Sequence, residues 1–262
     1  QRTAIVTGAS SGIGAEIARE LAKRGHGLIL VARRVQRLEE LKTELADRGV
    51  RIEVMPADLS ERADRERLVE DIQGGDLEVD ILVNNAGLST MGRVTEIGAG
   101  ATLNIIDEDV DAVADLCARM VPSMVGRGRG AVLNVASTAA YQPLPGQAGY
   151  AACKAFVLSY TQALHAELAG TGVRATALCP GPVRTEFAEV SGLGVAAAEE
   201  ALPEFMYCTA TEVALAGVDG LARGVPVVIP GIANRLTAVG ATVTPKRVLV
   251  PILARMHPAL KR

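Results

Sequence analysis

The sequence contains no tryptophan, and aromatic residues make up only 3% of it. Aromatic rings are the surfaces on which proteins stack single-stranded nucleic acid. The net charge of −3 at pH 7 and the isoelectric point near 5.7 give no general attraction for a phosphate backbone either. These features argue against a nucleic-acid-binding protein.

Cysteine and histidine are also scarce. The four cysteines (Cys117, Cys153, Cys179 and Cys208) form no C-x-x-C pair, and the three histidines are dispersed. Metal sites and disulfide frameworks need clustered or paired residues of these kinds, so the sequence predicts neither. Free cysteines suit a reducing compartment, and the chain opens in a strand-like run without a visible signal peptide. We therefore expect a cytoplasmic protein.

The sequence lacks membrane spans and domain boundaries as well. No apolar run is long enough to cross a bilayer, and no Pro/Gly/Ser linker, low-complexity tract or fixed repeat divides the chain. A chain of 262 residues with 49% hydrophobic content can bury one large core. We expect a single domain over residues 1–262.

Short aliphatic runs alternate along the chain with segments of helical periodicity. They predict strands at 3–7, 27–32, 51–57, 80–86, 130–137, 173–179 and 225–229. Strands that are apolar on both faces belong to a covered sheet, and strand–helix alternation implies right-handed parallel crossovers. The prediction is an α/β fold of the Rossmann type: a doubly wound parallel sheet of about seven strands with helices on both faces. Its ligand crevice would lie at the carboxyl ends of the strands.

The stretch TGASSGIG at 7–14 follows the first predicted strand and opens the first helix. Gly8, Gly12 and Gly14 permit a tight turn and the approach of a pyrophosphate to the amides of the helix N-terminus. Ser10 and Ser11 add hydroxyl donors. The alternative is an ordinary strand-to-helix turn, but the position after the first strand favours dinucleotide binding.

The end of the second predicted strand reads LILVARR, with Ala32 followed by Arg33 and Arg34. NAD-binding proteins usually place a carboxylate here to bind the adenosine ribose. No carboxylate is present to repel a 2′-phosphate, and guanidinium groups match phosphate in charge and geometry. NADP(H) is therefore favoured over NAD(H). The alternative is a solvated loop, which suits Arg34 better than Arg33.

Tyr150 and Lys154 are four residues apart and therefore share one face of a predicted helix. Ser137 lies thirteen residues before Tyr150, and NNAG occupies 84–87. With the glycine spacing G-x-x-x-G-x-G, these motifs resemble the short-chain dehydrogenase/reductase family over nearly the whole chain. The resemblance implies residues 1–135 as mainly dinucleotide-binding, 136–230 as catalytic and substrate lid, and 231–262 as a basic, apolar extension.

The resemblance implies a catalytic role for Ser137, Tyr150 and Lys154. As hydride reaches a carbonyl carbon, Tyr150 would protonate the oxygen as general acid, and would act as general base in the reverse direction. Lys154 and an oxidised nicotinamide ring would lower the pKa of Tyr150, Lys154 would hold the nicotinamide ribose, and Ser137 would hydrogen-bond the reacting oxygen. The activity implied is an NADPH-dependent carbonyl reductase or the reverse alcohol dehydrogenase.

The resemblance also assigns the remaining cofactor contacts. Asp58 and Leu59 would flank the adenine, although Asp58 could instead cap the following helix. The other implied contacts are Ile13 in the glycine loop, Asn85, Ala86 and Gly87 near the adenosine ribose, and Pro180, Gly181, Val183 and Thr185 at the nicotinamide amide.

One position departs from the family pattern. Counting back from Ser137, the helix site that usually carries an asparagine falls on Asp109, whereas Asn104 lies five residues earlier. An aspartate can accept a hydrogen bond from a relay water but cannot donate one as the amide does. Either the proton relay is modified or this alignment is shifted.

The segment 186–207 corresponds to the family's substrate lid. Its apolar residues Phe187, Val190, Leu193, Phe205 and Met206 favour a hydrophobic ketone or aldehyde as the substrate. The alternative is that they pack the lid onto its own domain.

The C-terminus after Asp219 carries no acidic residue. Its basic residues surround the apolar stretch VLVPILARM, which suits either a membrane surface or a helix docked across a subunit boundary. The second is favoured, because Pro245, Pro251 and Pro258 should interrupt a long surface helix. By family resemblance the helices at about 107–127 and 149–170 would form a homodimer or homotetramer.

Two other functions compete with the reductase. A non-redox epimerase or dehydratase would retain the cofactor and the Tyr–Lys pair, but the glycine spacing and short chain oppose it. A non-catalytic NADP-binding regulator or scaffold is opposed by intact Ser137, Tyr150 and Lys154, with Asp109 as its only support.

Overall fold

The computed structural model describes residues 2–186 and 203–260, and in these ranges seven parallel strands form one sheet. The strand order is β3-β2-β1-β4-β5-β6-β7, which confirms the predicted fold class. All seven strands coincide with predicted ones, most of them shorter by one to several residues. Their bounds are β1 Thr3–Thr7, β2 Gly27–Val31, β3 Ile52–Val54, β4 Val79–Asn84, β5 Gly130–Val135, β6 Val173–Leu178 and β7 Val227–Val228.

The central strands are buried on both faces, which explains their unbroken apolar sequences. Every residue of β1, β2 and β4 is buried. Because side chains alternate along a strand, Ile5 and Leu82 enter the core on one side of the sheet, while Val6 and Val83 enter the core on the other. The two cores hold a helical layer on each face.

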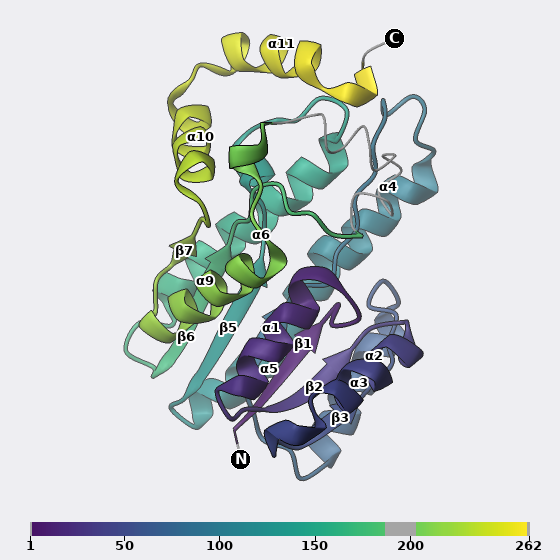
Figure 1. Cartoon of the computed structure of the whole chain (residues 1–262), viewed down its shortest axis with the longest axis vertical. Coiled ribbons are helices and arrows are strands. Elements are labelled where there is room, and N and C mark those ends of the chain that lie inside the picture. Colours follow the sequence, from purple (N-terminus) through teal and green to yellow (C-terminus); the bar gives the residue numbers. More distant parts are fainter. Residues whose placement is uncertain (1, 187–202, 261–262) are drawn as a thin grey trace.

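Among residues 2–186 and 203–260, helices pack on both faces of the sheet (Figure 1). On one face lie α1 Gly12–Lys23, α2 Val35–Glu44 and α9 Ala210–Arg223. On the other lie α3 Arg62–Gly74, α5 Ala112–Gly126 and α6 Ala148–Glu167. Short helical turns occur at Ala46–Arg48 (η1), Thr138–Tyr141 (η3) and Glu204–Met206 (η4).

The connection from β4 to β5 differs from the single helix predicted over 107–128. A first helix, α4 Ala99–Ile106, runs into a π-helical turn, η2 Asp107–Asp111, from which α5 continues. A π-helical turn contains one residue more than an α-helical turn, so it shifts which side chains face inward. This shift places Glu108 and Asp109 side by side in the interior.

The C-terminal segment forms two helices, α10 Ile232–Val243 and α11 Lys246–Met256, before the turn η5 Pro258–Leu260. The prediction that prolines break this region is only partly right. Pro245 separates α10 from α11, but Pro251 lies inside α11. Figure 1 shows α10 and α11 at the end of the molecule toward which the strands point. Within the described ranges no helix combines the length and apolarity needed to cross a membrane.

Candidate active site

The three predicted catalytic side chains meet at the carboxyl end of β5. Tyr150 and Lys154 lie in the first half of α6, with the Lys154 Nζ 5.7 Å from the centre of the Tyr150 ring. Ser137 follows β5, and its side chain is hydrogen-bonded to Tyr150. The Ser137 Oγ also accepts from the amide of Ala139 at 3.1 Å. That bond fixes the serine rotamer and leaves its hydrogen for donation to an oxygen in the site.

Asp109 belongs to this cluster, while its correspondence to the family's asparagine stays a prediction. Its Oδ2 lies 2.9 Å from the Lys154 Nζ, and its Oδ1 accepts from the amide of Leu88 at 2.7 Å. Both charged side chains are buried. Lys154 also donates to the carbonyl of Val135 at 3.2 Å. Asn104, in contrast, is exposed on α4.

The charges in the cluster are strongly coupled. Burial raises the pKa of Asp109, while the ammonium of Lys154 opposes the rise. Burial lowers the pKa of Lys154, but the negative charge of Asp109 and the proximity of Tyr150 outweigh it and leave that pKa raised. Each charge of the pair therefore favours the charged form of the other.

The pKa of Tyr150 is raised above its ordinary value of 10, although the contribution of Lys154 is the predicted lowering. The predicted effect of an oxidised nicotinamide ring stays a prediction. Burial is the largest cause. Lys154 and the Ser137 hydrogen bond oppose it, but Asp109 adds a negative charge that disfavours the phenolate. The aspartate thus offsets part of the effect that the lysine has on the tyrosine.

Glu108 is a second buried carboxyl in the same π-helical turn, and sequence reasoning did not identify it. Its Oε2 has no hydrogen-bond partner among the residues that the structure describes. Burial raises its pKa to about 7, with Asp109 and Asp58 adding to the rise and Arg33 and Lys154 opposing it. The only sequence signal was the acidic run at 107–109, which would suit an exposed helix end equally well.

The glycine loop and the NNAG segment pack together at the carboxyl ends of β1 and β4. A Cβ on Gly14 would collide with the side-chain amide of Asn85 and the carbonyl of Gly8. The Asn85 Nδ2 donates to the carbonyl of Thr7 at 3.0 Å. This glycine-lined cradle beside a helix N-terminus fits the pyrophosphate of a dinucleotide.

The second close approach is at Gly87. A Cβ there would lie 2.8 Å from the Asp109 Oδ1 and 3.1 Å from the Lys154 Nζ. Any larger residue would therefore separate or displace the buried ion pair.

Arg34 contacts the glycine loop, and its side chain is 46% exposed. Its guanidinium donates to the Oγ of Ser10 at 3.0 Å and to the Oγ of Ser11 at 2.6 Å. It also pairs with Glu186 at 2.9 Å, and Arg37 reaches the same carboxylate at 3.4 Å. A polar cleft of about 380 Å³ lies here, lined in part by Ser11, Arg37, Thr185 and Glu186. It does not reach Ser137, Tyr150 or Lys154.

Arg33 and Asp58 face each other across the same end of the sheet, 3.7 Å apart. Asp58 does not cap α3, whose N-cap residue is Glu61. Instead its Oδ1 accepts from the amide and hydroxyl of Ser60 at 3.1 and 2.7 Å. The loop that would contact adenine is therefore held by its own side chains.

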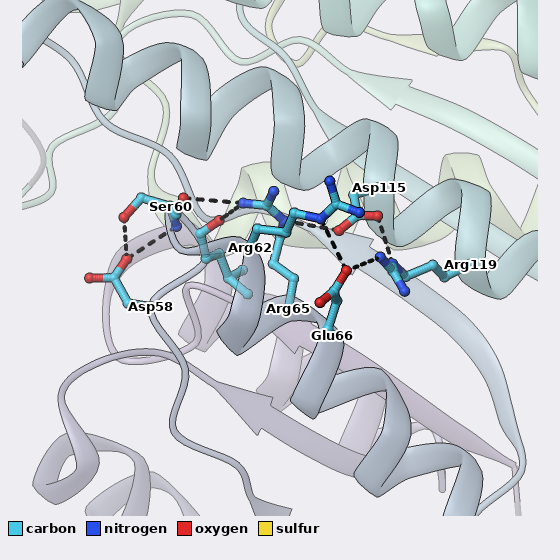
Figure 2. Close-up of polar contacts among 8 residues, drawn as sticks. Asp58, Ser60, Arg62, Arg65, Glu66, Asp115 and Arg119 are labelled. Carbon is cyan, nitrogen blue, oxygen red and sulfur yellow. Dashed lines mark hydrogen bonds and ion pairs between the residues drawn. The ribbon is translucent and has the colours of Figure 1, made fainter.

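The buried side chain of Arg65 holds the loop at 58–60 through hydrogen bonds to its backbone (Figure 2). Arg65 on α3 donates to the carbonyl of Leu59 at 2.7 Å and pairs with Asp115 on α5 at 3.0 Å. Arg119 extends the network by joining Asp115 at 2.6 Å to Glu66 at 3.0 Å. The loop at 58–60 is thus connected to α5, the helix that follows the π-helical turn.

The comparison with known families decides the assignment. The model of the short chain dehydrogenase family matches residues 2–195. The chain belongs to the short-chain dehydrogenase family. It is therefore an oxidoreductase.

Individual relatives agree with this assignment. Sulfoacetaldehyde reductase 2 of Chromohalobacter salexigens is 36% identical over 200 residues, covering 76% of this chain and 79% of the relative. A Sphingobium yanoikuyae short-chain dehydrogenase in complex with NADPH is 34% identical, with a TM-score of 0.83 over 96% and 95% of the two chains. The bulky-bulky ketone specific alcohol dehydrogenase of Comamonas testosteroni is 29% identical, with a TM-score of 0.78 over 100% and 97%.

In this short-chain dehydrogenase the predicted nicotinamide loop at 180–185 contacts the turn after Ser137, the segment before α9 and helix α10. The carbonyl of Pro180 accepts from the amide of Thr138 at 2.8 Å, and Val183 forms a parallel bridge with Cys208. Gly181 packs so closely on Asn234 of α10 that a Cβ would collide with it.

Asn234 was not identified from sequence. Its buried Nδ2 donates to the carbonyls of Pro230 and Met206, both at 3.1 Å. An asparagine within the apolar helix IANRLTAVG is a weak signal of such a role, because a buried amide needs partners.

Three residues of the predicted apolar lid, Phe187, Val190 and Leu193, lie outside the described residues. Of the other two, Phe205 is 76% exposed and Met206 is half-buried. Phe205 therefore does not pack onto its own domain.

Proposed function

We propose that the chain is an NADPH-dependent carbonyl reductase, or an alcohol dehydrogenase in the reverse direction, acting on a hydrophobic ketone, aldehyde or secondary alcohol. The observation that carries the proposal is the hydrogen-bonded Ser137–Tyr150 pair beside the buried ammonium of Lys154. These groups can donate to, and protonate, one substrate oxygen. The likeness to a reductase and to a ketone-specific alcohol dehydrogenase supports the same reaction class.

The catalytic side chains divide the work as follows. The nicotinamide cofactor, when bound, supplies the hydride. The Tyr150 hydroxyl donates its proton to the carbonyl oxygen, and the Ser137 hydroxyl donates a hydrogen bond to the same atom. The positive charge of Lys154 stabilises the phenolate that forms when Tyr150 gives up its proton, and Lys154 also holds the nicotinamide ribose. Asp109 keeps that lysine charged and in place.

We assign the cofactor to the groove around the glycine loop. Gly8, Ser10, Ser11, Gly12, Ile13 and Gly14 would hold the pyrophosphate, with Asn85, Ala86 and Gly87 beside them. Asp58 and Leu59 would flank the adenine, and Pro180, Gly181, Val183 and Thr185 the nicotinamide. Arg33 and Arg34 would bind the 2′-phosphate, because both guanidinium groups are about half exposed and Arg34 contacts the hydroxyls of Ser10 and Ser11. The NADPH-bound relative supports this assignment.

The decisive assay is NADPH oxidation against ketones that range from small and polar to long-chain and steroidal. We expect turnover with apolar ketones, and its loss in Tyr150→Phe with NADPH binding retained. Tight NADPH binding without reduction of any carbonyl would instead favour the regulator, for which the buried Asp109 is the supporting observation.

The cofactor assignment has its own test. Arg34→Ala and Arg33→Ala should each weaken NADPH binding at least roughly tenfold and leave NADH nearly unchanged, because each removes a charge-assisted contact to the 2′-phosphate alone. Glu186→Gln should tighten NADPH binding, because the Glu186 carboxylate competes for Arg34. Equal losses for both cofactors in the arginine variants would remove the phosphate assignment.

We further propose that the single-domain chain is cytoplasmic. We also propose that it forms a homodimer or homotetramer through α5 and α6. Val125 on α5 and Phe156 on α6 are exposed, and the Phe156 ring stacks on Tyr160. Apolar side chains exposed on long helices support association. Sedimentation equilibrium of the wild type and of Phe156→Ser tests this association, which the variant should weaken. A monomeric wild type would contradict the proposed oligomer.

A further inference from the structure

We propose that α10 and α11 form a docking surface for an anionic membrane, on which the protein lies without spanning it. This role lies beyond the catalytic function, and the surface is defined by the exposed side chains of these two helices.

The outer face of α10 is apolar and exposed. Ile232, Leu236, Val239 and Val243 recur at intervals of three or four residues, which aligns them along one side of the helix. Ile232 is 81% exposed and Val243 is 75% exposed. The opposite side is buried through Asn234, Ala238 and Ala241, so α10 is already anchored to the protein by its other face.

The outer face of α11 repeats this pattern. Val248, Ile252 and Met256 follow one another at intervals of four residues and are all exposed, while Leu249 and Leu253 are partly buried. The side chains of the two helices form apolar stripes that are about half to four-fifths exposed. A soluble surface rarely leaves two consecutive helices with such stripes.

Cations border both stripes. Arg235, Arg247 and Arg255 directly precede Leu236, Val248 and Met256, and all three arginines are exposed. Adjacent residues on a helix point about 100° apart, so each arginine lies beside its apolar stripe. Long cationic side chains in this position reach up to headgroups while the apolar residues enter the acyl boundary.

The charge of the whole segment selects an anionic partner surface. The last acidic residue is Asp219, and the basic residues after it are Arg223, Arg235, Lys246, Arg247, Arg255, Lys261 and Arg262. An isologous contact between two copies of this segment would set cations against cations without a carboxylate to pair them. An anionic lipid surface satisfies both the charge and the apolar stripes.

Helix α11 contacts the segments that position Ser137 and Tyr150. Lys246 donates to the carbonyl of Tyr141, in the turn after Ser137, at 3.3 Å. His257, at the end of α11, lies 3.3 Å from the side chain of Gln147, the N-cap residue of α6. Docking through α10 and α11 would therefore place the carboxyl end of the sheet toward the membrane (Figure 1). Delivery of an apolar substrate from the bilayer would follow, and this last consequence alone rests on the proposed function.

Vesicle flotation of the full chain tests the proposal. We expect the protein to float with vesicles of phosphatidylglycerol and phosphatidylcholine and to remain behind with phosphatidylcholine alone. Arg247→Glu/Arg255→Glu should reduce the bound fraction roughly tenfold or more, and Leu236→Ser/Ile252→Ser should do the same, because both charge and apolar insertion contribute. The controls are Arg62→Glu on α3 and Leu215→Ser on α9, which are exposed away from the surface and should bind as the wild type does.

Circular dichroism checks that each variant is folded, independently of any activity. Absence of binding to anionic vesicles by the folded wild type overturns the proposal, as does equal loss in the control variants. If sedimentation shows that Leu236→Ser/Ile252→Ser dissociates an oligomer while flotation is unchanged, the surface belongs to a second copy and the proposal fails. A chain without reductase activity that still floats leaves docking intact and removes only the proposed function.

Discussion

Asp109 introduces a negative charge into a cluster whose proton transfer depends on Tyr150. Alcohol oxidation needs the phenolate, so its rate should rise with pH through the pKa of Tyr150. Asp109 raises that pKa, and Asp109→Asn should therefore move the rising limb of kcat/KM to lower pH. The measurement is the pH profile of secondary-alcohol oxidation with NADP.

Asp111→Asn is the matched control, because Asp111 is exposed in the same π-helical turn. Its profile should coincide with that of the wild type. A limb that stays in place in Asp109→Asn, or moves equally in both variants, would show that the buried aspartate does not set the proton affinity of the tyrosine.

Single residues differ in how far sequence could place them. Spacing from Ser137 singled out Asp109, and the structure places its carboxylate beside Lys154. The inward position of Glu108 could not be foreseen, because a 3.6-residue period cannot reveal a π-helical turn. The contacts of Arg34 were also missed, as a long side chain is positioned by residues distant in sequence such as Glu186.

At the scale of elements, Arg65 connects α3 to α5 and to the adenine-side loop. It is buried, and its loss would leave Asp115 with Arg119 as its remaining partner and take away the donor to the carbonyls of Leu59 and Ser60. Arg65→Met should lower the free energy of unfolding by about 3 kcal/mol, measured by urea denaturation. Arg62→Met, on the exposed side of the same helix, should change it by less than about 1 kcal/mol (Figure 2). Equal effects would mean that burial of the Arg65 network contributes nothing.

The elements themselves followed the sequence patterns unevenly. The seven strands were predictable because buried parallel strands are continuously apolar. Helix α4 was missed, because its sequence AGATLNII opens with the small residues Ala-Gly-Ala and does not separate polar from apolar positions clearly. Pro251 suggested a break in α11 that did not occur; the carbonyl it leaves without a donor lies near the exposed start of the helix.

At the scale of the whole molecule, Glu108 links folding to pH. Its pKa is about 7 in the folded chain against an ordinary value of 4.5, so the native state holds the proton that the unfolded chain releases first. Stability should fall as the pH rises from about 4.5 through 7, with a full cost of about 3 kcal/mol above that window. Glu108→Gln removes this cost.

Urea unfolding of the cofactor-free protein at two pH values checks this prediction. Glu108→Gln should be more stable than the wild type by up to about 3 kcal/mol at pH 8 and by less than about 1 kcal/mol at pH 5. Glu70→Gln, an exposed carboxyl on α3, should show no pH-dependent difference. A gain of the same size at both pH values would assign the effect to packing rather than to ionisation.

The strand order has a consequence for how the chain is made. β1 leaves the ribosome before the six other strands of this sheet, yet it lies in the middle of the sheet and pairs with both β2 and β4. Its second edge stays open until Asn84 has been synthesised, and until then a strand that is fully buried in the folded chain is covered on one side only. The nascent N-terminal half is therefore the stage at which this protein most needs protection from aggregation, and slower translation between β2 and β4 would lengthen that exposure.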